Sequence, residues 1–136
     1  MKKKYRLLAP YIFPAFLAIS LTSCDSSDSG GEGANIKYQA EADGTEETCF
    51  RRIKYIDEDG VEKTQTPDEN SWSHWFTGTD GDHLYLLVQV DCNQAIASLY
   101  IGGDRVKRET SYNEAEIDGY LRIDEQGNAT FEESDQ

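Results

Sequence analysis

The chain has 136 residues, of which 26 are acidic and 13 basic, so its formal net charge is −13. This length allows one domain with a single small core. The excess of carboxylates repels nucleic acid and anionic lipid headgroups, so we expect no nucleic-acid partner. We interpret the acidic surface as a source of solubility, with recruitment of a basic partner as the alternative.

The N-terminal segment has the order of features of an export signal. Residues 1–6 are basic and residues 7–21 form an apolar run. A membrane span needs about 20 apolar residues, whereas a signal peptide needs fewer. The following Leu21-Thr22-Ser23-Cys24 matches a lipobox. We therefore predict a lipoprotein signal peptide over residues 1–23 and lipidation of Cys24. An ordinary signal peptide with an accidental cysteine and an uncleaved anchor are the alternatives.

Cleavage before Cys24 leaves 113 residues with a net charge of −17, because the removed segment holds four basic residues and no acidic one. Two acyl chains anchor a protein stably, so we expect a lipid-anchored protein of the bacterial cell envelope. Residues 24–35 are Gly-rich without large apolar side chains, which predicts a tether of roughly 17–20 Å. The inner membrane, the outer membrane and the cell surface remain open as locations.

From residue 36 the sequence changes to short segments in which apolar and polar residues alternate, as in β-strands. Turn sequences with Gly and Asp separate these segments. The alternating segments predict a domain over residues 36–123, with strands at 36–40, 50–56, 61–66, 71–77, 84–90, 97–101, 105–110 and 115–121. The remaining residues, 124–136, are polar and acidic, and we expect a frayed C-terminal tail.

The fold class follows from the number and spacing of these strands. No segment of the domain has the 3.6-residue periodicity of an amphipathic helix. Seven or eight short strands joined by tight turns are typical of an all-β, antiparallel β-sandwich of the immunoglobulin-like kind.

The order of the strand motifs resembles the envelope domain of the MmpS-type transport accessory proteins. The matching features run from about residue 36 to residue 121. The departures are lipidation in place of a transmembrane helix, four residues between Pro67 and Trp72 where the family has adjacent ones, and cysteines at other positions. The resemblance implies an immunoglobulin-like fold and a transporter partner, and it carries over no catalytic residues. The motifs are Ile36-Lys37-Tyr38, Ile53-Lys54-Tyr55, Asp59-Gly60, Pro67 with Ser71-Trp72-Ser73, the strand 84–90, and Leu99-Tyr100-Ile101-Gly102-Gly103.

Two cysteines, Cys49 and Cys92, remain in an exported domain, where disulfides form. Cys49 begins the second predicted strand and Cys92 ends the most apolar strand. In an immunoglobulin-like sheet these strands pair antiparallel, which places the two cysteines side by side. We predict a disulfide, with two buried free thiols or a reactive cysteine as alternatives.

Three aromatic residues, Trp75, Tyr85 and Tyr100, have the strand parity of the outward face. On one sheet they would form an apolar surface patch of the kind that binds partners. The alternatives are that they are scattered or that the tail covers them.

We expect neither a metal nor a cofactor. The two histidines, His74 and His83, lack the further converging ligands that a metal site needs. The turn 57–60 resembles the start of a calcium loop but lacks its later oxygen ligands. No nucleophile elbow, phosphate loop or zinc-protease motif occurs, so we predict that the protein is not an enzyme.

These features together predict a non-catalytic, lipid-anchored envelope protein. The leading hypothesis is an accessory or docking subunit of a membrane complex such as a transporter, with a protein partner in the envelope. The alternative hypothesis is a surface-displayed β-sandwich module that binds an external ligand, either a glycan or a host protein.

Overall fold

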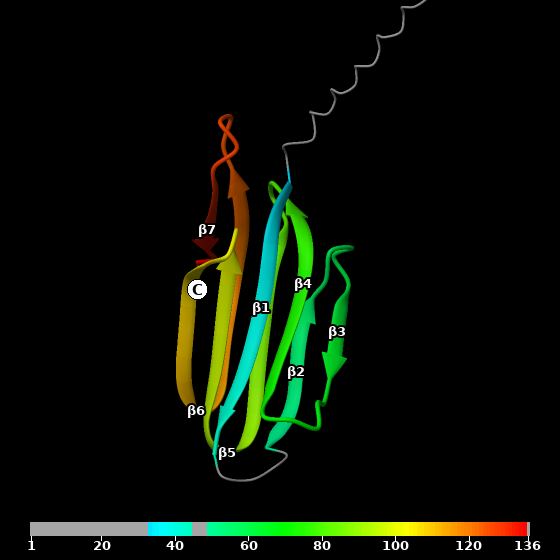
Figure 1. Ribbon diagram of the computed structural model, residues 1–136, viewed down its shortest axis with the longest axis vertical. Coiled ribbons are helices and arrows are strands. Elements are labelled where there is room, and N and C mark those ends of the chain that lie inside the picture. The colour runs from blue at the N-terminus through cyan, green and yellow to red at the C-terminus, as the bar shows by residue number, and fades with distance from the viewer. Residues whose placement is uncertain (1–32, 45–48, 136) are drawn as a thin grey trace, which may run out of the picture. The chain divides into compact units, whose positions relative to one another are not determined.

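The computed structural model describes residues 33–44 and 49–135, and within these ranges every regular element is a β-strand. All strand pairings are antiparallel (Figure 1). The seven strands are β1 (Gly33–Asp43), β2 (Phe50–Ile56), β3 (Glu62–Gln65), β4 (Ser71–Thr79), β5 (His83–Ile101), β6 (Asp104–Ile123) and β7 (Ala129–Glu133). The predicted all-β antiparallel fold is confirmed.

The strands form one hydrogen-bonded sheet that curls into two layers. Its order is β3-β2-β5-β1-β4, and β6 joins the other side of β5 and pairs in turn with β7. The first half of β5 lies between β2 and the second half of β6, whereas its second half lies between β1 and the first half of β6. We call the side with β2, β3 and β7 the first layer, and the side with β1 and β4 the second layer.

The long hairpin of β5 and β6 bends where it passes from one layer to the other. Its register shifts between Gln89 and Gln94 on β5. On β6, Asn113 has a positive φ of 72°, a backbone conformation that asparagine tolerates better than most residues. The Asn113 amide donates to the carbonyl oxygens of Val90, at 3.1 Å, and Cys92, at 3.3 Å. These bonds fix the bend of both strands at one point.

The core lies between the two layers and consists of the side chains that alternate inward. On β5 the inward positions are even-numbered up to Val90 and odd-numbered from Ala95, because β5 takes five steps from Gln89 to Gln94 where β6 takes two, and the three extra residues reverse the alternation. The largest fully buried residues include Tyr38, Ile36, Ile53, Leu84, Leu86, Leu99, Ile117 and Leu121. Side chains that point inward from two facing layers fill the interior of a small sandwich in this way.

The strand boundaries differ from the prediction in two ways. The segments 84–90 and 97–101 are halves of β5, and 105–110 and 115–121 are halves of β6. The apolar alternation is interrupted at the bend, and in the sequence such an interruption indicates two separate strands. In addition, β1 begins at Gly33, opposite Thr79 of β4, so residues 33–35 of the predicted tether belong to the domain.

The predicted frayed tail over residues 124–136 is wrong. Residues 129–133 form β7, which pairs with β6 from Gly119 to Ile123. Phe131 supplies an apolar anchor because it packs against the core. The Asp124 carboxylate accepts the backbone N–H groups of Gln126, at 2.9 Å, and Asn128, at 2.8 Å, and so closes the turn before β7. The packing of Phe131 and the turn closed by Asp124 therefore order this segment although its composition is acidic.

Replacing Gly119 by alanine should detach β7. A Cβ atom at this position would lie 2.5 Å from Cε1 of Phe131 and would also meet the backbone oxygen of Glu132. Overpacking of this kind costs about 2 kcal/mol, measured as the free energy of unfolding in urea. The exposed Thr130 on β7 provides the control, because Thr130→Ala should change this free energy by less than ~0.5 kcal/mol. Equal stability of the Gly119 variant and the wild type would contradict the close packing of β7.

Candidate functional site

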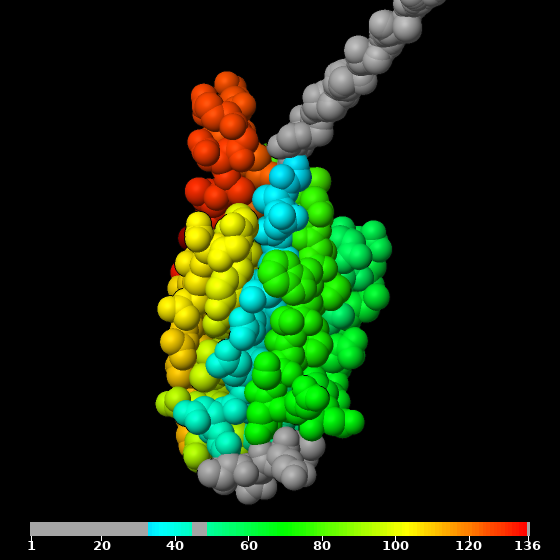
Figure 2. Space-filling view, viewed as in Figure 1, coloured from blue at the N-terminus to red at the C-terminus, as the bar shows by residue number. Residues whose placement is uncertain are grey.

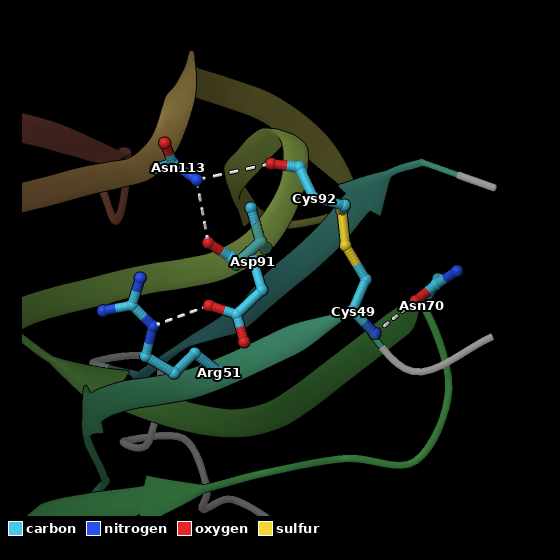
Figure 3. The surroundings of a disulfide bond; sticks show 7 residues. Cys49, Arg51, Asn70, Asp91, Cys92 and Asn113 are labelled. Carbon is cyan, nitrogen blue, oxygen red and sulfur yellow. Dashed lines mark hydrogen bonds and ion pairs between the residues drawn. A yellow bond between two sulfur atoms is a disulfide. The ribbon is translucent and has the colours of Figure 1, made fainter. Parts of the chain in front are cut away.

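The two cysteines of the domain form the predicted disulfide, with their Cα atoms 5.6 Å apart (Figure 3). The pairing of β2 with the first half of β5 brings them together, as the prediction required. Cys49 is buried in the core, and Cys92 lies at the bend of β5. The bond therefore ties the start of β2 to the point where the sheet passes between layers.

Hydrogen bonds surround the disulfide on both sides. The N–H of Cys49 donates to Oδ1 of Asn70 at 3.1 Å (Figure 3). The N–H of Asp91 donates to the carbonyl oxygen of Cys49 at 2.9 Å. The guanidinium of Arg51 donates to the Asp91 carboxylate at 3.0 Å. This corner has a structural role, since its polar groups bond to one another.

The structure does not bring the three predicted patch residues together. Trp75 and Tyr100 lie on the outer face of the second layer, whereas Tyr85 lies on the outer face of the first layer. Tyr85 and Tyr100 are on the same strand, and β5 bends between the layers so that its two halves expose opposite faces. A three-residue patch is therefore excluded, and a patch with Trp75 and Tyr100 remains.

A lysine joins Trp75 to Tyr100. In the sheet register, Lys37 of β1 lies opposite Trp75 of β4 on one side and opposite Tyr100 of β5 on the other. Its ammonium nitrogen is 4.9 Å from the centroid of the Trp75 ring and 4.2 Å from that of Tyr100. Both distances fall within the range of cation–π attraction. Trp75 nevertheless remains 61% exposed.

Two arginines extend this row across the sheet. Arg105 of β6 is the register partner of Tyr100, and Arg108 is the partner of Ser98 in the next outward row. Both arginine side chains are exposed. We call the surface formed by Trp75, Lys37, Tyr100, Arg105 and Arg108 the aromatic–cationic face. Figure 2 looks onto this layer, with β1 in cyan next to β4 in green on one side and, on the other side, the yellow end of β5 followed by the start of β6.

The basic residues of this face differ from those elsewhere in the described ranges. Within residues 33–44 and 49–135, Lys37, Arg105 and Arg108 make no ion pair. Arg52 also lacks one, but its guanidinium donates to the side-chain oxygen of Gln89 at 2.9 Å. Every other Lys or Arg in these ranges contacts a carboxylate: Arg51, Lys54, Lys63, Lys107 and Arg122.

The opposite outer face is acidic. The second half of β6 presents Glu114, Glu116 and Asp118 at alternate positions. Glu116 accepts the Tyr85 hydroxyl at 2.9 Å, and Asp118 lies 2.7 Å from Nε2 of His83. Burial, followed by the bond to Glu116, raises the pKa of Tyr85 well above its ordinary value. These carboxylates are held by neighbours on their own face, and Asp118 also lines a shallow hollow of about 350 Å³.

The histidines lie apart from one another. His74 is on the inward side of β4, where its ring stacks on that of Trp72. The centroid of the His74 ring is 6.2 Å from that of Trp72 and 4.8 Å from that of Tyr55. His83 begins β5 on the outer face of the first layer. No cluster of three or more metal-ligating side chains occurs in the described residues. In the same part of the chain, no helix is long and apolar enough to cross a membrane.

The turn over residues 57–60 is a hairpin turn between β2 and β3, with Gly60 at a φ of 78°. The Asp57 carboxylate accepts the N–H groups of Asp59, at 2.9 Å, and Val61, at 3.0 Å, and contacts Lys63 at 3.2 Å. The bond from Val61, followed by Lys63 and Asp59, lowers the pKa of Asp57 below its ordinary 3.8. The oxygens that suggested calcium are thus used by the turn itself.

The lowered pKa of Asp57 should make the folded protein less stable in acid. A folded-state pKa below the unfolded value stabilises the fold above about pH 4, and the contribution is lost as pH falls through the folded pKa. Asp57→Asn should therefore reduce the difference in unfolding free energy between pH 7 and pH 3, measured in urea. Asp59→Asn, an exposed change in the same turn, should leave that difference unchanged. An unaltered difference in the Asp57 variant would refute the role of this carboxylate.

The sequence reasoning missed the basic residues of the aromatic–cationic face. Lys37 alternates with the inward Ile36 and Tyr38, so its outward direction was readable. Its position between two aromatic rings was not readable, because it depends on the pairing of β1 with both β4 and β5. Arg105 and Arg108 lie on the strand that follows Tyr100 after a tight turn, and the register shift between Leu99 and Tyr100, which decides which of them lies beside the Tyr100 ring, was not readable.

No protein-family model matches the sequence, and a search of curated proteins finds no match. The functional argument therefore rests on the geometry of the described residues. Cys24, the predicted signal peptide over residues 1–23 and the predicted tether up to residue 32 lie outside them.

Proposed function

We propose that this protein is a non-catalytic, lipid-anchored binding module of the cell envelope, and that the aromatic–cationic face is its binding surface. The N-terminal lipid on Cys24 holds the domain at the membrane, and the tether lets it reach its partner. Tethering raises the effective concentration of the domain for any partner near the same membrane.

The observation that carries this proposal is the exposure of Trp75. The indole ring is 61% exposed and its centroid lies 4.9 Å from the Lys37 ammonium nitrogen, so it offers apolar contact area beside positive charge at one place on the surface. Trp, Tyr and Arg are also the residues that contribute most to binding at interfaces. The face lies on rigid paired strands, so binding would require little ordering of the chain.

Two kinds of partner are compatible with this role. The resemblance to the MmpS-type domain favours a protein partner in a membrane complex such as a transporter, which would make this chain an accessory subunit. The size of the face favours the alternative, a displayed module with an external ligand. Four strands by two outward rows cover roughly 260 Å², whereas a folded partner usually covers about 800 Å².

In-cell crosslinking of the full-length tagged protein tests the proposal. We expect the wild type to capture one dominant species, and both Cys24→Ala and Trp75→Ala to lose most of it. The matched control is Tyr112→Ala, because Tyr112 is 72% exposed but lies three outward rows from Tyr100. If capture persists in the Trp75 variant, the aromatic–cationic face is not the binding surface.

A further inference from the structure

We infer that the ligand of the aromatic–cationic face is an acidic polysaccharide, with carboxylate or sulfate groups, bound across strands β4, β1, β5 and β6. This inference rests on the proposed function, because it names the ligand of the same face. It assigns Trp75 and Tyr100 to the sugar rings, and Lys37, Arg105 and Arg108 to the anionic groups.

The first argument is charge. In the described residues this chain pairs most of its cations with its own carboxylates, yet three on one face have no carboxylate partner. Glu41, two outward rows from Lys37, accepts the side-chain amide of Gln39 at 2.7 Å and keeps its negative charge, but the three basic residues outnumber it. The face is therefore locally positive on an acidic protein, and salt at physiological strength screens the distant carboxylates beyond about 8 Å. Charge complementarity selects an anion.

The second argument is the arrangement of the rings. Trp75 and Tyr100 are two strands apart, or about 10 Å, with Lys37 between them. The C–H groups on one side of a pyranose ring pack on the face of an aromatic ring, while its substituents reach sideways to polar groups. We therefore expect a sugar chain in which one sugar stacks on Trp75 and another on Tyr100, while an acidic group between them pairs with Lys37.

The third argument is the direction of the row, which separates a polysaccharide from an acidic peptide. Extended peptides usually bind a sheet by adding a strand at its edge, where free backbone groups are available. The cations and rings of this protein instead run across four strands, from β4 at the end of the strand order over β1 and β5 to β6, and the backbone groups of β1 and β5 are directed to neighbouring strands. A thin chain that lies across side chains fits this row.

Binding of purified protein to acidic polysaccharides tests the inference. The probes are polygalacturonate, alginate and chondroitin sulfate, with methyl-esterified polygalacturonate as the uncharged counterpart of the first, in calorimetry at low salt. We expect at least one acidic probe to bind, the methyl ester to bind on the order of tenfold more weakly, and salt at about 0.5 M to weaken binding similarly. Trp75→Ala and the Arg105→Glu, Arg108→Glu pair should each weaken binding about tenfold.

Matched controls distinguish binding at the aromatic–cationic face from non-specific electrostatic binding of polyanions to the protein. Arg52→Glu reverses an exposed cation on the opposite outer face, and it should leave the affinity within about twofold. Poly-L-glutamate carries carboxylates without sugar rings and should bind at least tenfold more weakly than the best polysaccharide. The inference is overturned if no acidic polysaccharide binds, or if poly-L-glutamate binds as tightly. If the face crosslinks to a protein in cells while every polysaccharide fails, the binding-surface proposal stands and only the ligand assignment falls.

Discussion

Replacing both Cys49 and Cys92 by alanine should lower the free energy of unfolding by about 4 kcal/mol. The bond closes a loop with a sequence separation of 43 residues, and the chain-entropy estimate for a loop of this length gives that value. It also joins β2 to the bend of β5, so its loss should loosen the contact between the two layers. For a domain of this size the melting temperature should fall by about 20 °C.

The reduced wild-type protein provides the control for the disulfide. Reductant should destabilise the wild type to nearly the level of the double alanine variant, and it should leave that variant unchanged. Urea unfolding with and without reductant measures both effects. A loss below about 1 kcal/mol in both cases would show that the packing of β2 on β5 suffices without the bond.

The second large effect is expected for Tyr38→Phe. Tyr38 is fully buried between the layers, and burial raises the pKa of its hydroxyl above the ordinary value. This hydroxyl donates to the carbonyl oxygen of Ile56 at 2.9 Å and accepts the N–H of Tyr85 at 3.1 Å. Phenylalanine leaves both backbone groups without this partner, which should cost about 3 kcal/mol in the free energy of unfolding.

Tyr55→Phe is the matched control for this substitution. Tyr55 is also buried, and its ring lies 6.0 Å from that of Tyr38, but its hydroxyl makes no hydrogen bond within the part of the chain that the structure describes. The same loss of one oxygen should therefore cost less than ~0.5 kcal/mol there. If the two variants have the same free energy of unfolding, the bond network of Tyr38 does not connect the layers.

Local sequence signals predicted the fold class because they report on single strands. The alternation from Leu84 to Val90 marks a strand with one face in the core, and Gly102-Gly103 marks the tight turn between β5 and β6. The disulfide was predictable too, since the parity of Cys49 and Cys92 and the order of the strands both pointed to it.

The bend of β5 and β6 was not predictable, and the error over the patch follows from it. Residues 90–94 interrupt the apolar alternation in the same way as a turn does, so two strands were expected where one bent strand exists. That error places Tyr85 and Tyr100 on the same face. The aromatic–cationic face depends on side chains from four strands, and only the register brings Trp75, Lys37 and Arg105 into one row.

The opposite charges of the two outer faces fit a module that binds on one side only. On the first layer, carboxylates such as Glu116 and Asp118 have partners on their own surface. On the second layer, the cations have none within the described residues. The acidic face of such a module maintains its solubility while the positive face binds.

Position-resolved photo-crosslinking in cells tests the binding surface most directly. A diazirine amino acid would replace Ser73, which is exposed beside Gln39 on the aromatic–cationic side, or Thr64, which is exposed on β3 of the opposite layer. We expect a strong adduct from position 73 that Trp75→Ala abolishes, and little or none from position 64. Equal adducts from both positions, or an adduct from position 64 alone, would contradict the account.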